Sequence, residues 1–168
     1  MSLNNEIYVI RSAASPIREP GAAGEEMRSI DHEGEKEIQQ LGIGLVQLVT
    51  EPIREVRFAP ANRTRRTALG AIGLTCTSIH IQRDEQLTNT DPKHLRQYLD
   101  DISDEQGPVV LFTHLDVIQS MVEALNGRRP DDEAIPTATL TRIDRTPDGP
   151  KVIYVGRTID EATKSAAV

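Results

Sequence analysis

The chain has 168 residues, the size of one domain, and this length is enough to bury a core without a disulfide or metal. Its formal net charge of −7 argues against nucleic acid as a partner, because phosphate backbones select basic surfaces. We see no apolar run long enough for a membrane span and no secretory signal, and the single cysteine, Cys76, excludes an intrachain disulfide. We therefore expect a cytoplasmic protein with no nucleic-acid or membrane partner.

Predicted strands and helices alternate along the chain. Short β-branched runs predict strands at 6–10, 55–58, 78–82, 109–113, 137–143 and 151–155. Apolar residues at helical spacing predict helices at 35–49, 61–73, 94–103 and 116–125, with cap signals at Asp31, Asp91-Pro92 and Asn126-Gly127. This alternation predicts a mostly parallel sheet in which the strands that begin near Ile7, Val56 and Val109 are neighbours.

The expected architecture is a single-domain, three-layer α/β/α sandwich over residues 1–156, followed by a polar tail at 157–168. The last two strands are separated only by a turn-rich segment, so they predict an antiparallel edge. A long polar loop at 13–30 follows the first strand, and such loops are usually functional or mobile.

Polar residues follow three predicted strands where each strand ends. The first strand ends in Arg11-Ser12, the second leads through Ala59-Pro60 to Arg63, and the fourth ends in Thr113-His114. In an open α/β sheet these ends form the ligand-binding edge. Guanidinium forks and helix N-termini both suit phosphate oxygens, so Arg11, Arg63 and His114 are candidate phosphate-binding residues.

The same residues carry a resemblance to the histidine phosphatase superfamily, whose fold is called phosphoglycerate mutase-like. Its Arg-His-Gly signature is similar to Arg11-Ser12-Ala13, its Leu-Thr-x-x-Gly signature to 30–34, and its Ser-Pro-x-x-Arg-x-x-x-Thr-Ala box to 59–68. A strand ending in Ser/Thr-His is matched at 109–114. The short connection between Ile79 and Val109 is most similar to the small bacterial phosphohistidine phosphatases.

The chain departs from that family at its nucleophile. The family's histidine is Ser12 here, its glycine is Ala13, and the next residue is Ala14. A serine hydroxyl is a poor nucleophile without a base. A mutation introduced at position 12 alone would also explain the serine. The changes at Ala13 and Ala14 favour natural divergence instead. Glycine at 13 would provide backbone space or a positive φ, so we expect histidine at 12 to require glycine at 13 as well.

Other polar residues have weaker assignments. The resemblance implies a proton donor, often an acid after the family's fourth strand. Glu85 is the nearest candidate, and a solvated charge is the competing interpretation. Asp116 either orients His114 or caps the following helix. Arg65 and Arg66 are expected on a helix surface, one of them near an acidic neighbour. The remaining histidines are expected at surface or half-buried positions: His32, His80 and His94. No metal or organic cofactor is expected.

Three functional hypotheses remain open from the sequence. The first is a catalytically impaired protein that binds a phosphorylated small molecule or phosphoprotein. The second is an active phosphohydrolase that uses Ser12 as nucleophile, or His114 as a base for water. The third is a non-enzymatic scaffold in which the pocket residues are relics. The sequence does not indicate the oligomeric state.

Overall fold

The computed structural model describes residues 6–15, 29–73, 79–103 and 107–157. Its strands are β1 (Glu6–Arg11), β2 (Glu55–Phe58), β3 (Ile81–Arg83), β4 (Val109–Thr113), β5 (Thr139–Thr146) and β6 (Gly149–Arg157). Its α-helices are α1 (His32–Leu48), α2 (Asn62–Ile72), α3 (Pro92–Ser103) and α4 (Leu115–Asn126), and two 3₁₀ turns are η2 (Glu85–Thr88) and η3 (Asp132–Ala134).

The strands form one mixed sheet in the order β3-β2-β4-β1-β5-β6. The first four in this order run parallel, whereas β5 pairs antiparallel with both β1 and β6. Residue Ile7 of β1 lies opposite Val109, and Val56 of β2 lies opposite Val110, so the predicted neighbouring strands are confirmed. The antiparallel edge is also confirmed.

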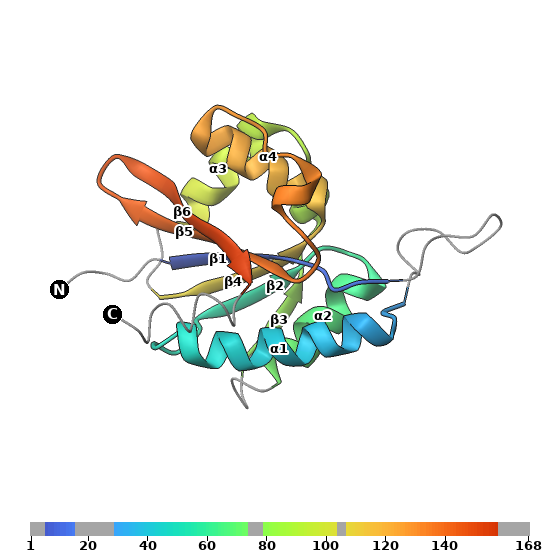
Figure 1. The fold of residues 1–168 in the computed structure, drawn as a ribbon. Coiled ribbons are helices and arrows are strands. Elements are labelled where there is room, and N and C mark those ends of the chain that lie inside the picture. Colours follow the sequence, from blue (N-terminus) through green and yellow to red (C-terminus); the bar gives the residue numbers. More distant parts are fainter. Residues whose placement is uncertain (1–5, 16–28, 74–78, 104–106, 158–168) are drawn as a thin grey trace.

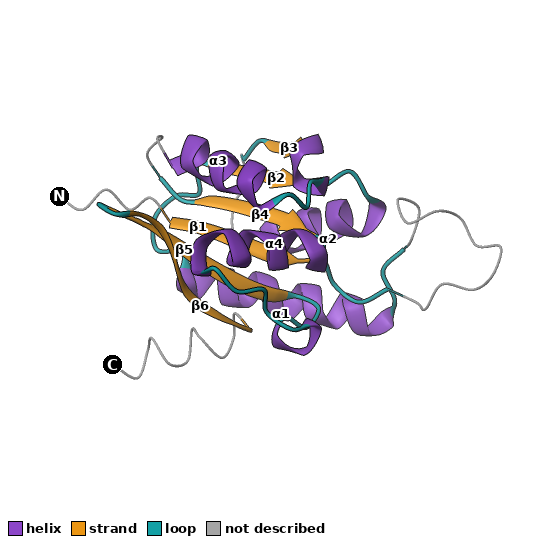
Figure 2. Ribbon diagram, turned by 90° about the horizontal axis from the view of Figure 1, so that it is seen from above, coloured by secondary structure: helices purple, strands orange, loops and turns teal. Residues whose placement is uncertain are grey.

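Helices cover both faces of the sheet, with α3 and α4 on one side and α1 and α2 on the other (Figure 1). The view from above places α4 over the central strands and α1 beneath them (Figure 2). Alternate residues of β1 serve the two layers: Val9 packs with the α3–α4 side and Ile10 with the α1–α2 side. Both sides of the central strands are therefore buried, which explains their continuous apolar sequences.

Several element boundaries differ from the sequence prediction. Helix α1 begins at His32 because Oδ1 of Asp31 accepts the N–H of Gly34 at 2.7 Å, so the predicted cap starts the helix directly. Strand β3 is shorter and later than predicted, since it pairs only with the three residues Val56–Phe58. Strands β5 and β6 are longer than predicted, and Arg157 ends β6 rather than opening a tail.

Parts of the predicted organisation lie outside the described residues: most of the 13–30 loop, Cys76 and the rest of the C-terminal tail. The described residues include no helix long and apolar enough to cross a membrane.

Candidate functional site

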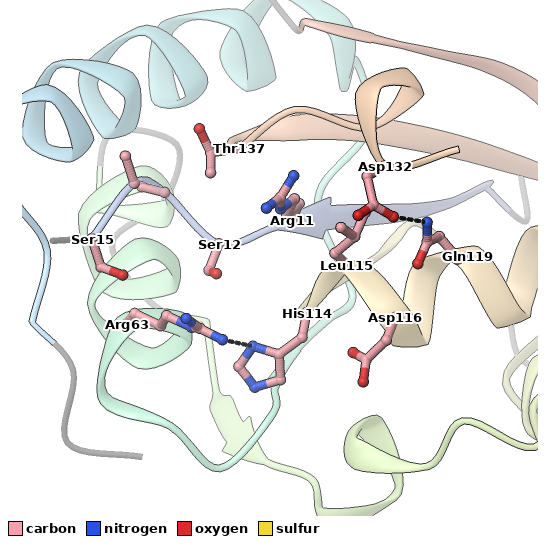
Figure 3. A pocket seen from close by; sticks show the side chains of 12 residues that line it. Arg11, Ser12, Ser15, Arg63, His114, Leu115, Asp116, Gln119, Asp132 and Thr137 are labelled. Carbon is pink, nitrogen blue, oxygen red and sulfur yellow. Dashed lines mark hydrogen bonds between the residues drawn. The ribbon is translucent and has the colours of Figure 1, made fainter. Parts of the chain in front are cut away.

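Three elements bring their polar residues to one edge of the sheet, as predicted. Arg11 is the last residue of β1, His114 follows β4, and Arg63 lies in the first turn of α2. These three residues and Ser12 line the same open cavity of about 640 Å³. Figure 3 shows the Ser12 hydroxyl directed toward Arg63 and His114, with Arg11 beside it.

A hydrogen bond joins Arg63 to His114. Nη2 of Arg63 lies 3.0 Å from Nδ1 of the imidazole. A guanidinium can only donate, so Nδ1 accepts and the neutral ring carries its proton on Nε2. His114 occupies the N-cap position of α4 without capping the helix through its side chain. The imidazole is therefore fixed against Arg63, beside backbone N–H groups suited to an anion.

Arg11 is held from the opposite wall. Its Nη1 donates to the carbonyl of Ile135 at 2.6 Å, a contact across 124 residues of sequence. Burial, followed by the positive charge of Arg63, lowers the pKa of Arg11 below its ordinary value, while Asp132 and Glu37 act in the other direction. The two guanidiniums repel each other, so an anion between them would relieve an unfavourable charge interaction.

A buried threonine connects the two sides of the site. Oγ1 of Thr67 accepts the N–H of Ala13 at 3.1 Å and donates to the carbonyl of Arg63 at 2.6 Å. The side chain of Thr67 is fully buried. It therefore fixes the backbone after Ser12 relative to the turn of α2 that carries Arg63.

The start of α1 closes against the same backbone. The N–H of Asp31 donates to the carbonyl of Ala14 at 3.2 Å. A Cβ on Gly34 would lie 2.2 Å from that carbonyl oxygen, so the close approach requires glycine. This is the glycine of the 30–34 motif, and its role is the absence of a side chain.

Residue 13 does not need glycine for its backbone conformation. Among the described residues, Ala138 is the only non-glycine residue with a positive φ, at 56°. A positive φ at residue 13 is therefore excluded for this chain, and the need for backbone space there stays a prediction.

The remaining predicted residues have the following positions. Glu85 does not line the cavity: it is exposed, and it accepts a hydrogen bond from Arg83 at 2.8 Å on the surface. Asp116 does line the cavity and accepts the N–H of Val117 at 2.9 Å in the first turn of α4. Arg66 forms an ion pair with Glu35, as expected of an arginine on the surface of α2.

The segment between α4 and β5 contributes residues that the sequence did not indicate. Asp132 and Thr137 line the cavity, as does Gln119 of α4. Nε2 of Gln119 donates to Oδ1 of Asp132 at 2.7 Å (Figure 3). These residues carry no motif spacing, and only the folding of 130–138 across the end of β1 brings them to the site.

No known family matches the sequence, and no curated protein matches it. Solved structures do match the fold. The protein histidine phosphatase SixA complexed with tungstate is 15% identical, with a TM-score of 0.78 over 93% of this chain and 99% of that one.

Two further structures align over similar lengths. Phosphoglycerate mutase from Bacillus anthracis str. Sterne is 14% identical, with a TM-score of 0.72 over 96% of this chain and 98% of that one. Phosphoserine phosphatase from Entamoeba histolytica, in complex with 3-phosphoglyceric acid, is 12% identical, with a TM-score of 0.69 over 92% and 98%. At these identities the likeness concerns the fold: this chain has the phosphoglycerate mutase-like fold of the histidine phosphatases.

Proposed function

We propose that this chain binds a phosphorylated small molecule or phosphoprotein in the cavity between Arg11, Arg63 and His114, and that serine at position 12 leaves it catalytically impaired. The observation that carries the proposal is the convergence of two guanidiniums and a helix N-terminus on one cavity that Ser12 also lines. A phosphoryl dianion would neutralise both guanidiniums and accept hydrogen bonds from backbone N–H groups at the start of α4.

The impairment follows from the chemistry of residue 12. A serine hydroxyl needs a base to become a nucleophile. His114 is the nearest candidate, but its Nδ1 accepts from Arg63 and its Nε2 then carries the proton. Neither nitrogen has a lone pair free to take a proton from Ser12 or from water. An active phosphohydrolase would therefore need the Arg63–His114 hydrogen bond to break.

Anion binding is the first test. Tungstate, phosphate and sulfate should each raise the melting temperature relative to chloride at equal ionic strength. At a hundred times Kd, binding adds about 2.7 kcal/mol, or roughly 5–10 °C for a domain of this size. Arg63→Ala should remove most of the rise. Arg65→Ala is the matched control, because Arg65 is exposed on the same helix and does not line the cavity.

An unchanged melting temperature with all three anions, in the wild type as in Arg63→Ala, would contradict ligand binding and favour the scaffold hypothesis. Equal loss of binding in Arg65→Ala would instead assign the effect to general surface charge.

Turnover is the second test. Wild-type protein should hydrolyse phosphomonoesters at the background rate and form no acid-labile phosphoenzyme. Ser12→His combined with Ala13→Gly should restore some turnover and form an acid-labile adduct on residue 12, detectable by mass spectrometry after a phosphodonor pulse. Robust wild-type turnover that Ser12→Ala abolishes would establish a serine nucleophile. Turnover that survives Ser12→Ala and disappears in His114→Ala would establish direct attack by water. The cytoplasmic location remains a prediction.

A further inference from the structure

Gln119 is a buried polar residue in the wall of the cavity. Only 4% of it is exposed, and a buried amide is unfavourable unless its polar groups are hydrogen-bonded. Nε2 donates to the carbonyl of Pro130 at 3.0 Å and to Oδ1 of Asp132 at 2.7 Å, and Oε1 accepts from Nη2 of Arg129 at 3.0 Å. All three partners lie between α4 and β5. The buried amide therefore connects this segment to α4.

The same segment also holds Arg11. The carbonyl of Ile135 accepts a hydrogen bond from Nη1 of Arg11 at 2.6 Å, and the N–H of Ile135 donates to the carbonyl of Asp132 at 3.3 Å. Burial and the charge of Arg63 lower the pKa of Arg11, whereas the negative charge of Asp132 opposes this shift, so the carboxylate also interacts with the guanidinium. Figure 3 shows Asp132 between Gln119 and Arg11. A continuous series of contacts therefore leads from Gln119 to Arg11.

The start of the segment depends on Gln119 more than its end does. Residues 131–134 are exposed, so packing in the core does not hold them. Near β5, by contrast, Oγ1 of Thr137 donates to Oε1 of Glu37 on α1 at 3.0 Å. Ile135 is fully buried, and the competing interpretation is that its packing alone fixes the carbonyl that accepts the arginine.

We infer that Gln119 is a positioning residue, which holds Arg11 through the segment 130–135 in the orientation that binds a phosphoryl group. This inference rests on the proposed function. A guanidinium binds two phosphate oxygens only when its plane faces them, so fixing Arg11 beforehand lowers the entropy that binding costs. Both N–H groups of the amide already have partners, so Gln119 acts through Arg11 and not on the anion itself.

Gln119→Met tests this role without a ligand, because methionine is also unbranched and of similar length but has no N–H to donate. Guanidinium NMR measures the rate of rotation about the Nε–Cζ bond of each arginine. The rate for Arg11 should rise about two- to tenfold, the effect of weakening one hydrogen bond. The rate for Arg63 should not change.

Phosphate titration by calorimetry then tests whether the orientation of Arg11 matters for binding. The Kd of Gln119→Met for phosphate should be about two- to tenfold higher than that of the wild type. In a double-mutant cycle, Gln119→Met should have no further effect in Arg11→Ala but should keep its effect in Arg63→Ala.

Two more variants complete the experiment. Gln119→Glu keeps the length of the side chain and an acceptor for Arg129 but presents a carboxylate to Asp132, so it should free Arg11 at least as much as methionine does. Gln97→Met is the matched control, because Gln97 also donates from Nε2 to an aspartate, Asp101, at 2.8 Å, but is exposed on α3 and does not line the cavity. It should change neither the rotation of Arg11 nor the Kd.

Unchanged rotation of Arg11 in both Gln119 variants would overturn the inference in favour of packing by Ile135, and phosphate binding by the wild type would still support the proposed function. An equal loss of affinity in the Arg11→Ala and Arg63→Ala backgrounds would also overturn it, since Gln119 would then support the site as a whole. Failure of the wild type to bind phosphate would overturn the proposed function and the inference with it.

Discussion

Gly34→Ala tests whether the start of α1 is packed against the site as closely as the structure indicates. Helix propensity alone predicts that alanine stabilises this position, by up to about 1 kcal/mol. Packing predicts the opposite. The new Cβ would lie 2.2 Å from the carbonyl oxygen of Ala14 and 2.5 Å from Cγ2 of Ile30, whereas carbon and oxygen normally approach to about 3.3 Å.

The carbonyl oxygen must therefore move by about 1 Å, and it cannot rotate away as a side chain could. Overpacking of this kind costs about 1–3 kcal/mol. The shift also stretches the hydrogen bond from the N–H of Asp31, which is 3.2 Å long and worth about 1 kcal/mol. After the gain in helix propensity, we expect a net loss of roughly 1–4 kcal/mol, or about 3–12 °C in melting temperature.

Thermal unfolding followed by circular dichroism measures the loss, with and without tungstate. The anion-induced rise in melting temperature should also shrink, because Ala14 lines the cavity. Gln39→Ala is the control at an exposed position of the same helix and should change stability by less than about 0.5 kcal/mol. An unchanged or higher melting temperature for Gly34→Ala would refute the close approach of these two segments.

Two other predictions test the site and the core. Thr67→Val is nearly isosteric but leaves the N–H of Ala13 without its buried acceptor, so it should lower the free energy of unfolding by about 1–3 kcal/mol and weaken phosphate binding. Thr67→Ser should restore the binding, and equal phosphate affinity in both variants would contradict the role of the hydroxyl. Burial, reinforced by Glu6 at Tyr8 and by Asp84 at Tyr98, raises the pKa of both phenols. Their stabilising contribution is therefore complete below the ordinary tyrosine pKa of about 10 and is lost as pH rises above it. Tyrosinate absorbance from both residues should appear together with the loss of circular dichroism. Tyrosinate absorbance that appears at a lower pH than the loss of circular dichroism would contradict their burial.

The central strands could be predicted from the sequence because burial on both faces leaves a continuous apolar run. The run Val109–Phe112 is such a case, and its predicted pairing neighbours are correct. Strand β3 could not be placed as well, because Gln82 and Arg83 are exposed and its bounds depend on how many residues pair with β2. Pairing partners are a property of the sheet that the local pattern does not contain.

The positions of Arg11 and His114 in the site could also be predicted from the buried strands. Arg11 and His114 follow buried parallel strands, so topology alone brings them to one edge. The place of Asp132 depends on non-local packing. It reaches the cavity through η3, which no periodicity indicates, and it accepts a hydrogen bond from Gln119 on a different helix. Glu85 illustrates the converse, since a position near the end of β3 did not bring its side chain to the cavity.

The backbone that carries Ser12 is fixed by contacts that do not involve the side chain at position 12. The N–H of Ser12 donates to the carbonyl of Thr113 at 3.0 Å, which continues the pairing of β1 with β4. The N–H of Ala138 donates to the carbonyls of Arg11 and Ser12, at 3.1 and 3.3 Å. Ala138 makes these bonds with φ at 56°, a conformation that costs alanine roughly 1–2 kcal/mol and persists only where the surroundings impose it.

Thr67 accepts the N–H of Ala13, and the N–H of Asp31 donates to the carbonyl of Ala14, which Gly34 allows to approach. Residues 11–14 are therefore restrained by contacts from β4, α2, α1 and the segment before β5. These restraints act on the backbone, so a histidine side chain at position 12 would contribute to none of them. The geometry that holds Arg11 near Arg63 is therefore independent of the side chain at position 12. Burial, followed by the charge of Arg63, lowers the pKa of Arg11, and Asp132 and Glu37 offset part of this effect; an anion between the two guanidiniums would offset more of it. The proposed phosphate site therefore does not depend on which side chain stands at position 12.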